Sequence, residues 1–142
     1  MFIMSYSLIA DVGLRNDIFE DQYKFLNAIS IGVAGSVVES TVKMLPDQRG
    51  VICRALGTTS GNLHRLYKRK ALDKQQSEEI LDILSVYSAA YELYDDMSTA
   101  TELLNTPIPA LNNQKPTDLL DTFMGRCLVK EMLNKMAWGE FS

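Results

Sequence analysis

The sequence predicts an all-α protein. Apolar residues recur at helical spacing along nearly the whole chain, and no segment of useful length alternates with the period of two that is typical of a strand. Prolines, glycines and capping residues divide this pattern into segments of helical length. With 142 residues, of which 46% are hydrophobic and 23% charged, the chain is long enough for one ordinary domain with a short appended module.

Two helices are expected first. Asn16 or Asp17 can cap a helix that runs to about Ile29. Gly32 and Gly35 then break it, and the next helix runs from Ser36 to Leu45, just before Pro46, whose ring disfavours a helical conformation in the preceding residue. The apolar stripe of the first helix consists of Ile18, Phe19, Tyr23, Phe25 and Leu26.

Two shorter helices follow. Asp47 can cap a helix from Gln48 to Leu56, which Gly57 ends at a position that usually requires a left-handed residue. The stretch 58–60 offers caps for a further helix from Gly61 to about Lys70. Two short helices joined by a tight turn containing glycine have the spacing of a helix-turn-helix.

A long helix is expected after Asp73, which resembles a capping box together with Gln76. It ends near Asp95 and Asp96, and the domain boundary is placed at residues 95–98. A helix from Ser98 to Leu104 then runs into a fixed loop, 105–113, and Pro116 opens the next helical segment. One stripe of the long helix consists of Ile80, Leu84, Tyr87, Tyr91 and Tyr94, and one face of the last helix of Leu128, Val129, Met132, Leu133 and Met136.

Charge is distributed unevenly. Residues 43–70 carry seven basic side chains against the single acid Asp47, a net charge of +6 inside a chain whose net charge is −4. Phosphate neutralisation dominates DNA affinity, so a basic block of this kind indicates either a DNA-binding element or a solvated face.

The helix-turn-helix model assigns these residues to DNA. The second helix of such a motif lies in the major groove, so Ser60, Asn62 and Arg65 are candidates for contacts to base edges. Thr59 and Ser60 can also cap the helix while Leu63 and Leu66 pack it. The candidates for contacts to the DNA backbone are Thr59, Tyr67, Lys68 and Arg69.

Patterns of catalysis and metal binding are not found in the sequence. It contains no GxSxG, GxxxxGK[ST], GxGxxG, HExxH or CxxC pattern, and its one histidine, His64, lies in the basic segment. Adjacent acids such as Glu78 and Glu79 point about 100° apart on a helix and are interpreted as solvated. We therefore predict no enzyme activity, no cofactor and no metal.

The cellular setting follows from two observations. Cys53 and Cys127 each lie in a helical apolar pattern, which favours buried thiols in a reducing compartment over a disulfide. No apolar run approaches the roughly 20 residues that span a bilayer, and the N-terminus lacks the features of a signal peptide. A cytoplasmic protein without a membrane partner is expected.

The C-terminal end carries Trp138 and Phe141 within its last five residues. Aromatic side chains at a chain end leave apolar surface in contact with water, which is unfavourable unless other residues or a partner cover it. The two side chains either fold back on Leu133 and Met136 or insert into a partner, and composition alone does not decide between these alternatives.

Two segments resemble a known family. The stretch VICRALGTTSGNLHR, 51–65, followed by 72–79, is similar to the Xre-like helix-turn-helix of Xre/MbcA/ParS antitoxins. The stretch LLNTPIPAL, 103–111, then KPTDLLDT, 115–122, Gly125-Arg126 and 139–142 resemble that family's toxin-binding domain. Where many members of that family have glycines after PAL, this chain has Asn112-Asn113. The resemblance does not extend to residues 1–29.

The resemblance implies the antitoxin of a type II toxin–antitoxin module. Its partner would be a RES-domain toxin that consumes NAD, which the C-terminal region neutralises by direct contact, and operator DNA would be bound for autorepression. The toxin-binding residues that it implies, together with the tail, are Asn105, Thr106, Pro107, Leu111, Trp138, Gly139, Glu140, Phe141 and Ser142.

The expected organisation is an N-terminal helical extension, 1–30, a helix-turn-helix DNA-binding domain, 31–96, and a toxin-binding domain, 97–142. A homodimer is expected, because one recognition helix contacts little DNA and operator symmetry mirrors protein symmetry. The alternative is a helix-turn-helix transcription regulator whose C-terminal region serves only for dimerisation, and a small helical enzyme is the third possibility.

Overall fold

The computed structural model describes residues 9–139 and confirms the all-α prediction. Among these residues no strand is found, and the one isolated β-bridge joins Ile108 and Gln114. The α-helices are α2 (Gln22–Ile31), α3 (Gly35–Met44), α4 (Arg49–Leu56), α5 (Leu63–Tyr67), α6 (Lys74–Tyr94), α7 (Met97–Leu104) and α8 (Phe123–Ala137), and the 3-10 helices are η1 (Pro46–Gln48), η2 (Pro109–Leu111) and η3 (Pro116–Leu119).

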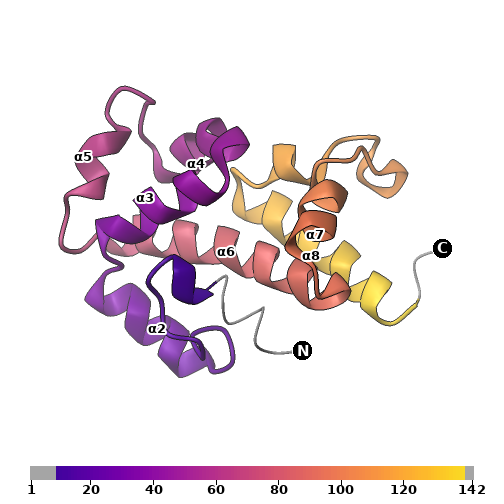
Figure 1. Ribbon diagram of the computed structural model, residues 1–142, viewed down its shortest axis with the longest axis horizontal. Coiled ribbons are helices and arrows are strands. Elements are labelled where there is room, and N and C mark those ends of the chain that lie inside the picture. Colours follow the sequence, from indigo (N-terminus) through magenta and orange to yellow (C-terminus); the bar gives the residue numbers. More distant parts are fainter. Residues whose placement is uncertain (1–8, 140–142) are drawn as a thin grey trace.

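The long helix α6 runs through the centre of the molecule, with α2 to α5 around its first half and α7 and α8 around its second half (Figure 1). Two clusters of buried apolar residues share it. Ile80, Leu81 and Leu84 belong to the cluster formed with α2 to α5. Val86, Tyr87 and Ala90 belong to the cluster formed with α7, η3 and α8. One helix therefore supports both halves of the molecule.

The start of the first helix was predicted too early. Residues 16–20 form turns, and α2 begins at Gln22 because the Asp21 carboxylate accepts a hydrogen bond from the Tyr23 backbone N–H. The predicted apolar stripe is wrong at two positions, since Tyr23 is 81% exposed and Leu26 is 56% exposed. Gly32 ends the helix with a φ of 98°, as a helix-breaking glycine should.

Capping predictions met with mixed results. Asp73 does cap α6 by accepting from the Gln76 N–H, but the Gln76 side chain donates to the Leu56 carbonyl, so the reciprocal half of a capping box is not formed. Asp47 does not cap α4, which follows η1 directly and has Gln48 at its N-cap without a side-chain bond. Gly57 has a φ of 68°, which confirms its left-handed conformation.

The loop after α7 is ordered by local hydrogen bonds, as its prolines and asparagines predicted. The Ile108 N–H donates to the Gln114 carbonyl at 3.1 Å, and the Asn113 N–H donates to the Ile108 carbonyl at 3.0 Å. Asn112 and Asn113 both have a positive φ, near 60°. Pro116 opens the short η3 rather than the last helix, which begins separately after a Thr122 cap.

Tyr94, Leu128 and Cys127, which the sequence predicts to be buried, are partly or largely exposed. Leu128 is 43% exposed, whereas Val129, Met132 and Leu133 are buried as expected. Cys53 is buried and Cys127 half-buried, and both are free thiols. Burial raises the pKa of the Cys53 thiol, although the charges of Arg49 and Arg54 act in the opposite direction.

In the described part of the chain, no single helix is both long and apolar enough to cross a membrane. The pair α2 and α3 passes that test only when taken together, and it is bent by 112°.

Candidate functional site

The residues predicted to bind DNA lie together on the corner formed by α4, the turn 57–62 and α5, at one end of the long axis (Figure 1). Thr59, Ser60, Asn62, Arg65, Lys68 and Arg69 are exposed, and Tyr67 is half-buried. The arrangement has the order of a helix-turn-helix. Its second helix is shorter than predicted, because the turn continues to Asn62 and α5 ends at Tyr67.

Local bonds define this corner. The left-handed Gly57 lets the Thr58 N–H donate to the Cys53 carbonyl at 3.0 Å, which ends α4. The Asn62 N–H then donates to the Thr59 carbonyl and, at 3.3 Å, to the Thr59 hydroxyl. Leu63 and Leu66 are buried, so α5 is held against the core while its polar side chains face solvent.

Arg49, a residue that the sequence did not single out, holds the corner from the first turn of α4. Its Nε donates to the Ser60 hydroxyl at 3.0 Å, one terminal nitrogen donates to the Ser60 carbonyl at 3.1 Å, and the other donates to the Tyr67 hydroxyl at 3.4 Å. One guanidinium therefore joins α4, the turn and the end of α5.

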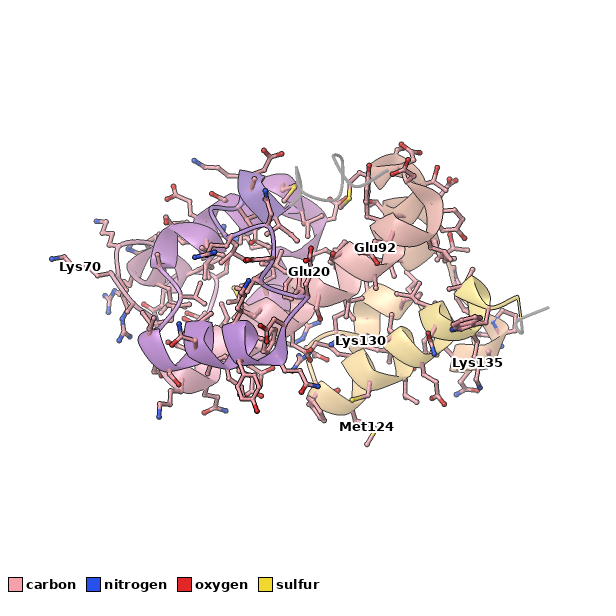
Figure 2. The ribbon with its side chains drawn as sticks, turned by 90° about the horizontal axis from the view of Figure 1, so that it is seen from below. Glu20, Lys70, Glu92, Met124, Lys130 and Lys135 are labelled. Atoms are coloured by element: carbon pink, nitrogen blue, oxygen red, sulfur yellow. The ribbon has the colours of Figure 1, made fainter. Side chains whose placement is uncertain are left out.

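Basic side chains gather at this end of the molecule, where Lys70 extends away from the ribbon (Figure 2). In the part that the structure describes, Arg65, Lys68, Arg69 and Lys70 make no ion pair and are exposed. Arg54, by contrast, is paired with Asp121 at 2.8 Å. The cations available to an anionic partner are thus those of α5 and the segment after it.

The predicted toxin-binding loop is built around Asn105. Its side-chain oxygen accepts from Gln48 at 3.2 Å and from the Thr117 hydroxyl at 3.3 Å, and its amide nitrogen donates to the Thr101 carbonyl at 2.9 Å. Asn105 therefore joins α7, η1 and η3, and both its amide oxygen and its amide nitrogen form hydrogen bonds within the chain. Thr106 and Pro107 are exposed, and Leu111 is half-buried against the second core.

A small cavity of about 140 Å³ lies beside Asn105, between η1, α6 and α7. Gln48, Thr101 and Tyr87 contribute to its lining. The Tyr87 hydroxyl is buried and has no hydrogen-bond partner among the described residues. Burial raises the pKa of Tyr87, so its hydroxyl stays protonated.

The last helix ends at Trp138, for which the sequence left two alternatives open. Trp138 forms the C-cap of α8 and is 75% exposed, so it does not fold back on Leu133 and Met136. Gly139 follows with a φ of 72°. The remaining predicted contacts, Glu140, Phe141 and Ser142, lie outside the described residues.

A buried ionic network, which the sequence did not predict, connects α8 to α6. Arg126 is 1% exposed and donates to Asp82 at 2.6 Å, to the Leu120 carbonyl at 2.8 Å and to Glu79. Lys130 donates to the other oxygen of Asp82. The expectation that Glu79 is a solvated acid is therefore wrong, because Arg126 enters the same side of α6 from α8.

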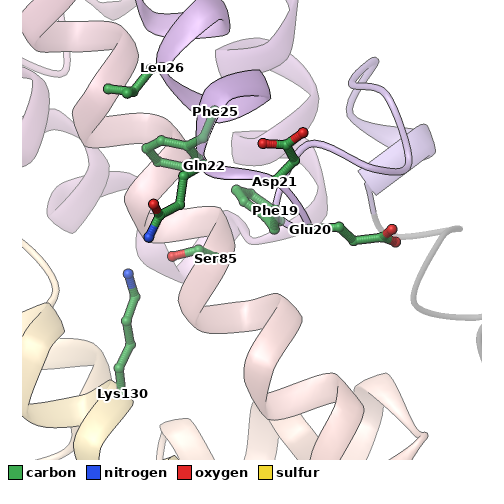
Figure 3. A pocket seen from close by; sticks show the side chains of 8 residues that line it. All are labelled: Phe19, Glu20, Asp21, Gln22, Phe25, Leu26, Ser85 and Lys130. Carbon is green, nitrogen blue, oxygen red and sulfur yellow. The ribbon is translucent and has the colours of Figure 1, made fainter.

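A pocket of about 430 Å³, lined by acidic, basic and apolar side chains, lies beside the start of α2 (Figure 3). Two of its polar groups are engaged elsewhere, since Ser85 donates to the Asp82 carbonyl and Lys130 to the Asp82 carboxylate. Glu20 points away from the others in this view. Among the described residues, no group of three or more histidine, cysteine or acidic side chains is placed to hold a metal ion.

Comparison with known proteins bears on the second half most directly. Residues 89–139 match the family described as the antitoxin Xre/MbcA/ParS C-terminal toxin-binding domain. The chain is also 29% identical over 122 residues to "Antitoxin Xre" of Yersinia enterocolitica serotype O:8, a match that covers 82% of this chain and 80% of that protein. Both comparisons support an antitoxin, and residues 89–139 supply the part that matches a toxin-binding domain.

Proposed function

We propose that the protein is a type II antitoxin that neutralises a RES-domain, NAD-consuming toxin by direct contact and represses its own operon. The observation that carries the proposal is the match of residues 89–139 to a toxin-binding domain. The organisation proposed is an extension at 1–30, a DNA-binding domain at 31–96 and a toxin-binding domain at 97–142. Both partners act in the cytoplasm.

The geometry at the C-terminal end supports toxin binding. The loop 105–111 is rigid before any partner arrives, because its prolines and its internal hydrogen bonds leave little conformational freedom to lose. Trp138 adds a large exposed aromatic where the tail begins. Aromatic side chains of this kind often dominate the energy of an interface.

DNA binding is assigned to the opposite end of the molecule. The corner of α4 and α5 lies far from the end of α8 along the long axis, so a toxin on one end leaves the other open (Figure 1). The exposed Arg65, Lys68 and Arg69 match a phosphate backbone. A homodimer presents two such corners to a symmetric operator, and light scattering at micromolar concentration tests it.

A second candidate function has its own supporting observation. Phe123, Met124 and Leu128 are exposed on α8, at 62%, 64% and 43%. An apolar face of this kind favours a contact between copies of the chain. In that case the protein is a transcription regulator whose C-terminal region serves only for dimerisation.

Deleting residues 138–142 separates the two functions. Burial of one large aromatic is worth on the order of 2–3 kcal/mol, so the truncated protein should lose the rescue of cells that express the toxin of the neighbouring reading frame. Binding to the DNA upstream of the gene, measured by gel shift with the same protein, should persist. Copurification of the two full-length proteins tests the complex directly.

Tyr23→Ala is the matched control, since Tyr23 is an aromatic of similar exposure on α2, at the other half of the molecule. It should rescue growth as the unaltered protein does. Full rescue by the truncated protein would exclude the tail as the inhibitory element and favour the regulator.

A further inference from the structure

The turn between α4 and α5 has little packing of its own. Gly57 and Gly61 have no atoms within 4 Å of the place where a side chain would begin, and Thr59, Ser60 and Asn62 are exposed. Apart from its backbone bonds and the Thr59 hydroxyl, which accepts from the Asn62 N–H, the turn is held by the Arg49 guanidinium, which donates to both the hydroxyl and the carbonyl of Ser60.

The other contact of Arg49 ties the turn to the core. The ring of Tyr67 packs against the first apolar cluster, so its hydroxyl is a fixed point, and Arg49 donates to it at 3.4 Å. The planar guanidinium presents several N–H donors in fixed directions, so it can bond to Ser60 and Tyr67 at once, whereas the compact ammonium of a lysine cannot reproduce this arrangement. The position of Ser60 is thereby fixed relative to α5.

We infer that Arg49 is a positioning residue that sets the α4–α5 turn for DNA before DNA arrives. This inference rests on the DNA-binding part of the proposed function. Its three donated bonds lie inside the chain, so Arg49 acts through Ser60 and Tyr67 rather than through a phosphate of its own. An ordered turn loses less conformational entropy on binding than a disordered one.

The same bonds define what Ser60 and Tyr67 offer to the DNA. Each hydroxyl oxygen accepts a hydrogen bond from Arg49, so each O–H is left to donate outward. Two outward O–H donors suit an anionic phosphodiester oxygen, and Ser60 accordingly contacts the DNA backbone instead of the base edge that the sequence suggested.

The test compares Arg49→Gln, Arg49→Lys and Lys68→Gln, each titrated over a range of salt with two duplexes of equal length. One duplex covers the region upstream of the gene and the other has random sequence. Arg49→Gln should weaken binding to both duplexes by about tenfold. It should not change the salt slope, which is the slope of the logarithm of the binding constant against the logarithm of the salt concentration. Lys68→Gln should lower the slope by about one, as loss of a phosphate contact does.

Arg49→Lys keeps the charge but not the fork, so it should resemble Arg49→Gln. Recovery of affinity by Arg49→Lys, or a salt slope lowered by about one in Arg49→Gln, would identify a direct phosphate contact and overturn the inference. Unchanged affinity in Arg49→Gln would overturn it as well.

Amide hydrogen exchange in the free protein gives a second measurement that needs no DNA. The Asn62 N–H, bonded to Thr59, should exchange about tenfold faster in Arg49→Gln, while amides of α6 keep their rates. Equal exchange at residues 58–62 would refute the positioning role. Absence of salt-dependent binding by the unaltered protein would instead refute the DNA-binding function, and exchange would still decide the role of Arg49.

Discussion

Arg126 is the largest fully buried side chain in the described part of the chain, and its charge is matched by two acids of α6. Burial of a charge is costly unless it is paired and hydrogen-bonded. Its guanidinium meets both requirements, because Asp82, Glu79 and the Leu120 carbonyl all accept from it. The residue therefore fixes the start of α8 against the middle of α6.

Replacing Arg126 by methionine should lower the free energy of unfolding by about 3–5 kcal/mol, because Asp82 is then left buried with only Lys130 as a cationic partner. Urea denaturation followed by circular dichroism measures the change. Lys135→Met is the matched control, since Lys135 forms an exposed ion pair with Glu131 on the same helix. The control should change stability by less than about 0.5 kcal/mol, and an equal effect of the two variants would contradict the importance of burial.

The same network predicts a pH dependence. Burial of Asp82 opposes its charged form, but hydrogen bonds from Lys130 and Arg126 and their charges outweigh this effect, so the pKa of the Asp82 carboxyl is lowered from 3.8. A lowered pKa in the folded state gives stability that is present above the unfolded pKa and is lost as the pH falls through the folded pKa. Stability should therefore fall as the medium is acidified below about pH 4.

Asp82→Asn should be less stable at neutral pH and should show a shallower fall in acid, because it lacks the group that titrates. Urea midpoints at several pH values between 7 and 3 make the comparison. Parallel pH profiles of the two proteins would mean that other carboxylates carry the acid sensitivity, and Asp17 and Asp96, whose pKa values are lowered by hydrogen bonds from Lys24 and Thr99, are the ones to test next.

Helix ends were predictable where one residue has a conformational reason to be there. Gly57 and Asp73 are such residues, because a left-handed φ and a side-chain cap are local properties. The start of α2 was not, since Asn16, Asp17 and Asp21 are all good caps and the ion pairs of Asp17 with Arg15 and Lys24 favour a turn there. The choice among equivalent caps depends on tertiary contacts.

The candidate sites divide in the same way. Exposure of the cationic corner followed from the local charge pattern, whereas the sequence left open whether Trp138 folds back on the last helix, and the structure was needed to show that it is exposed. The contacts of Arg49 with Ser60, of Asn105 with Gln48 and of Arg126 with Asp82 could not be predicted, because the two residues of each pair are 11, 57 and 44 positions apart in the sequence. Composition and spacing carry no information about such pairings without the fold.

Gly125 shows how one residue sets the position of a helix. A Cβ at this site would lie 1.8 Å from the Leu119 carbonyl oxygen, because the first turn of α8 packs directly on the backbone of η3. Gly125→Ala must separate these elements and should destabilise the protein by about 1–3 kcal/mol, the usual cost of overpacking. Thermal unfolding monitored by circular dichroism measures the loss.

Gly61→Ala is the control for Gly125→Ala, because nothing lies within 4 Å of the Cβ position there. Alanine at an unstrained glycine position reduces the freedom of the unfolded chain, so this variant should keep or slightly raise stability. A Gly125→Ala protein as stable as Gly61→Ala would show that α8 can move away from η3 at no cost.

At the scale of the whole molecule, α6 makes the two halves dependent on each other. Ile80, Leu81 and Leu84 belong to the first apolar cluster, and most of the buried apolar residues that follow belong to the second. Arg54 of α4 also pairs with Asp121 beyond η3. The matched segment 89–139 begins inside this helix. The half that matches a toxin-binding domain therefore shares part of its core with a helix that also completes the half proposed to bind DNA.

A fragment of residues 97–142 should for this reason not fold alone. It lacks Ile83, Val86 and Tyr87, all at most 1% exposed, and with them three large side chains that close the second core. Each is worth roughly 1.5–3 kcal/mol when buried, and their sum rivals the 5–15 kcal/mol that stabilises a typical whole domain. A fragment of residues 74–142 regains these side chains, so it should melt cooperatively, though at a lower temperature than the full chain because Leu45 and Val51 are still missing. Far-ultraviolet circular dichroism during heating compares the three proteins. A cooperative transition in 97–142 would mean that the C-terminal segment completes its core without α6, and that the two halves are coupled only through their surface contacts.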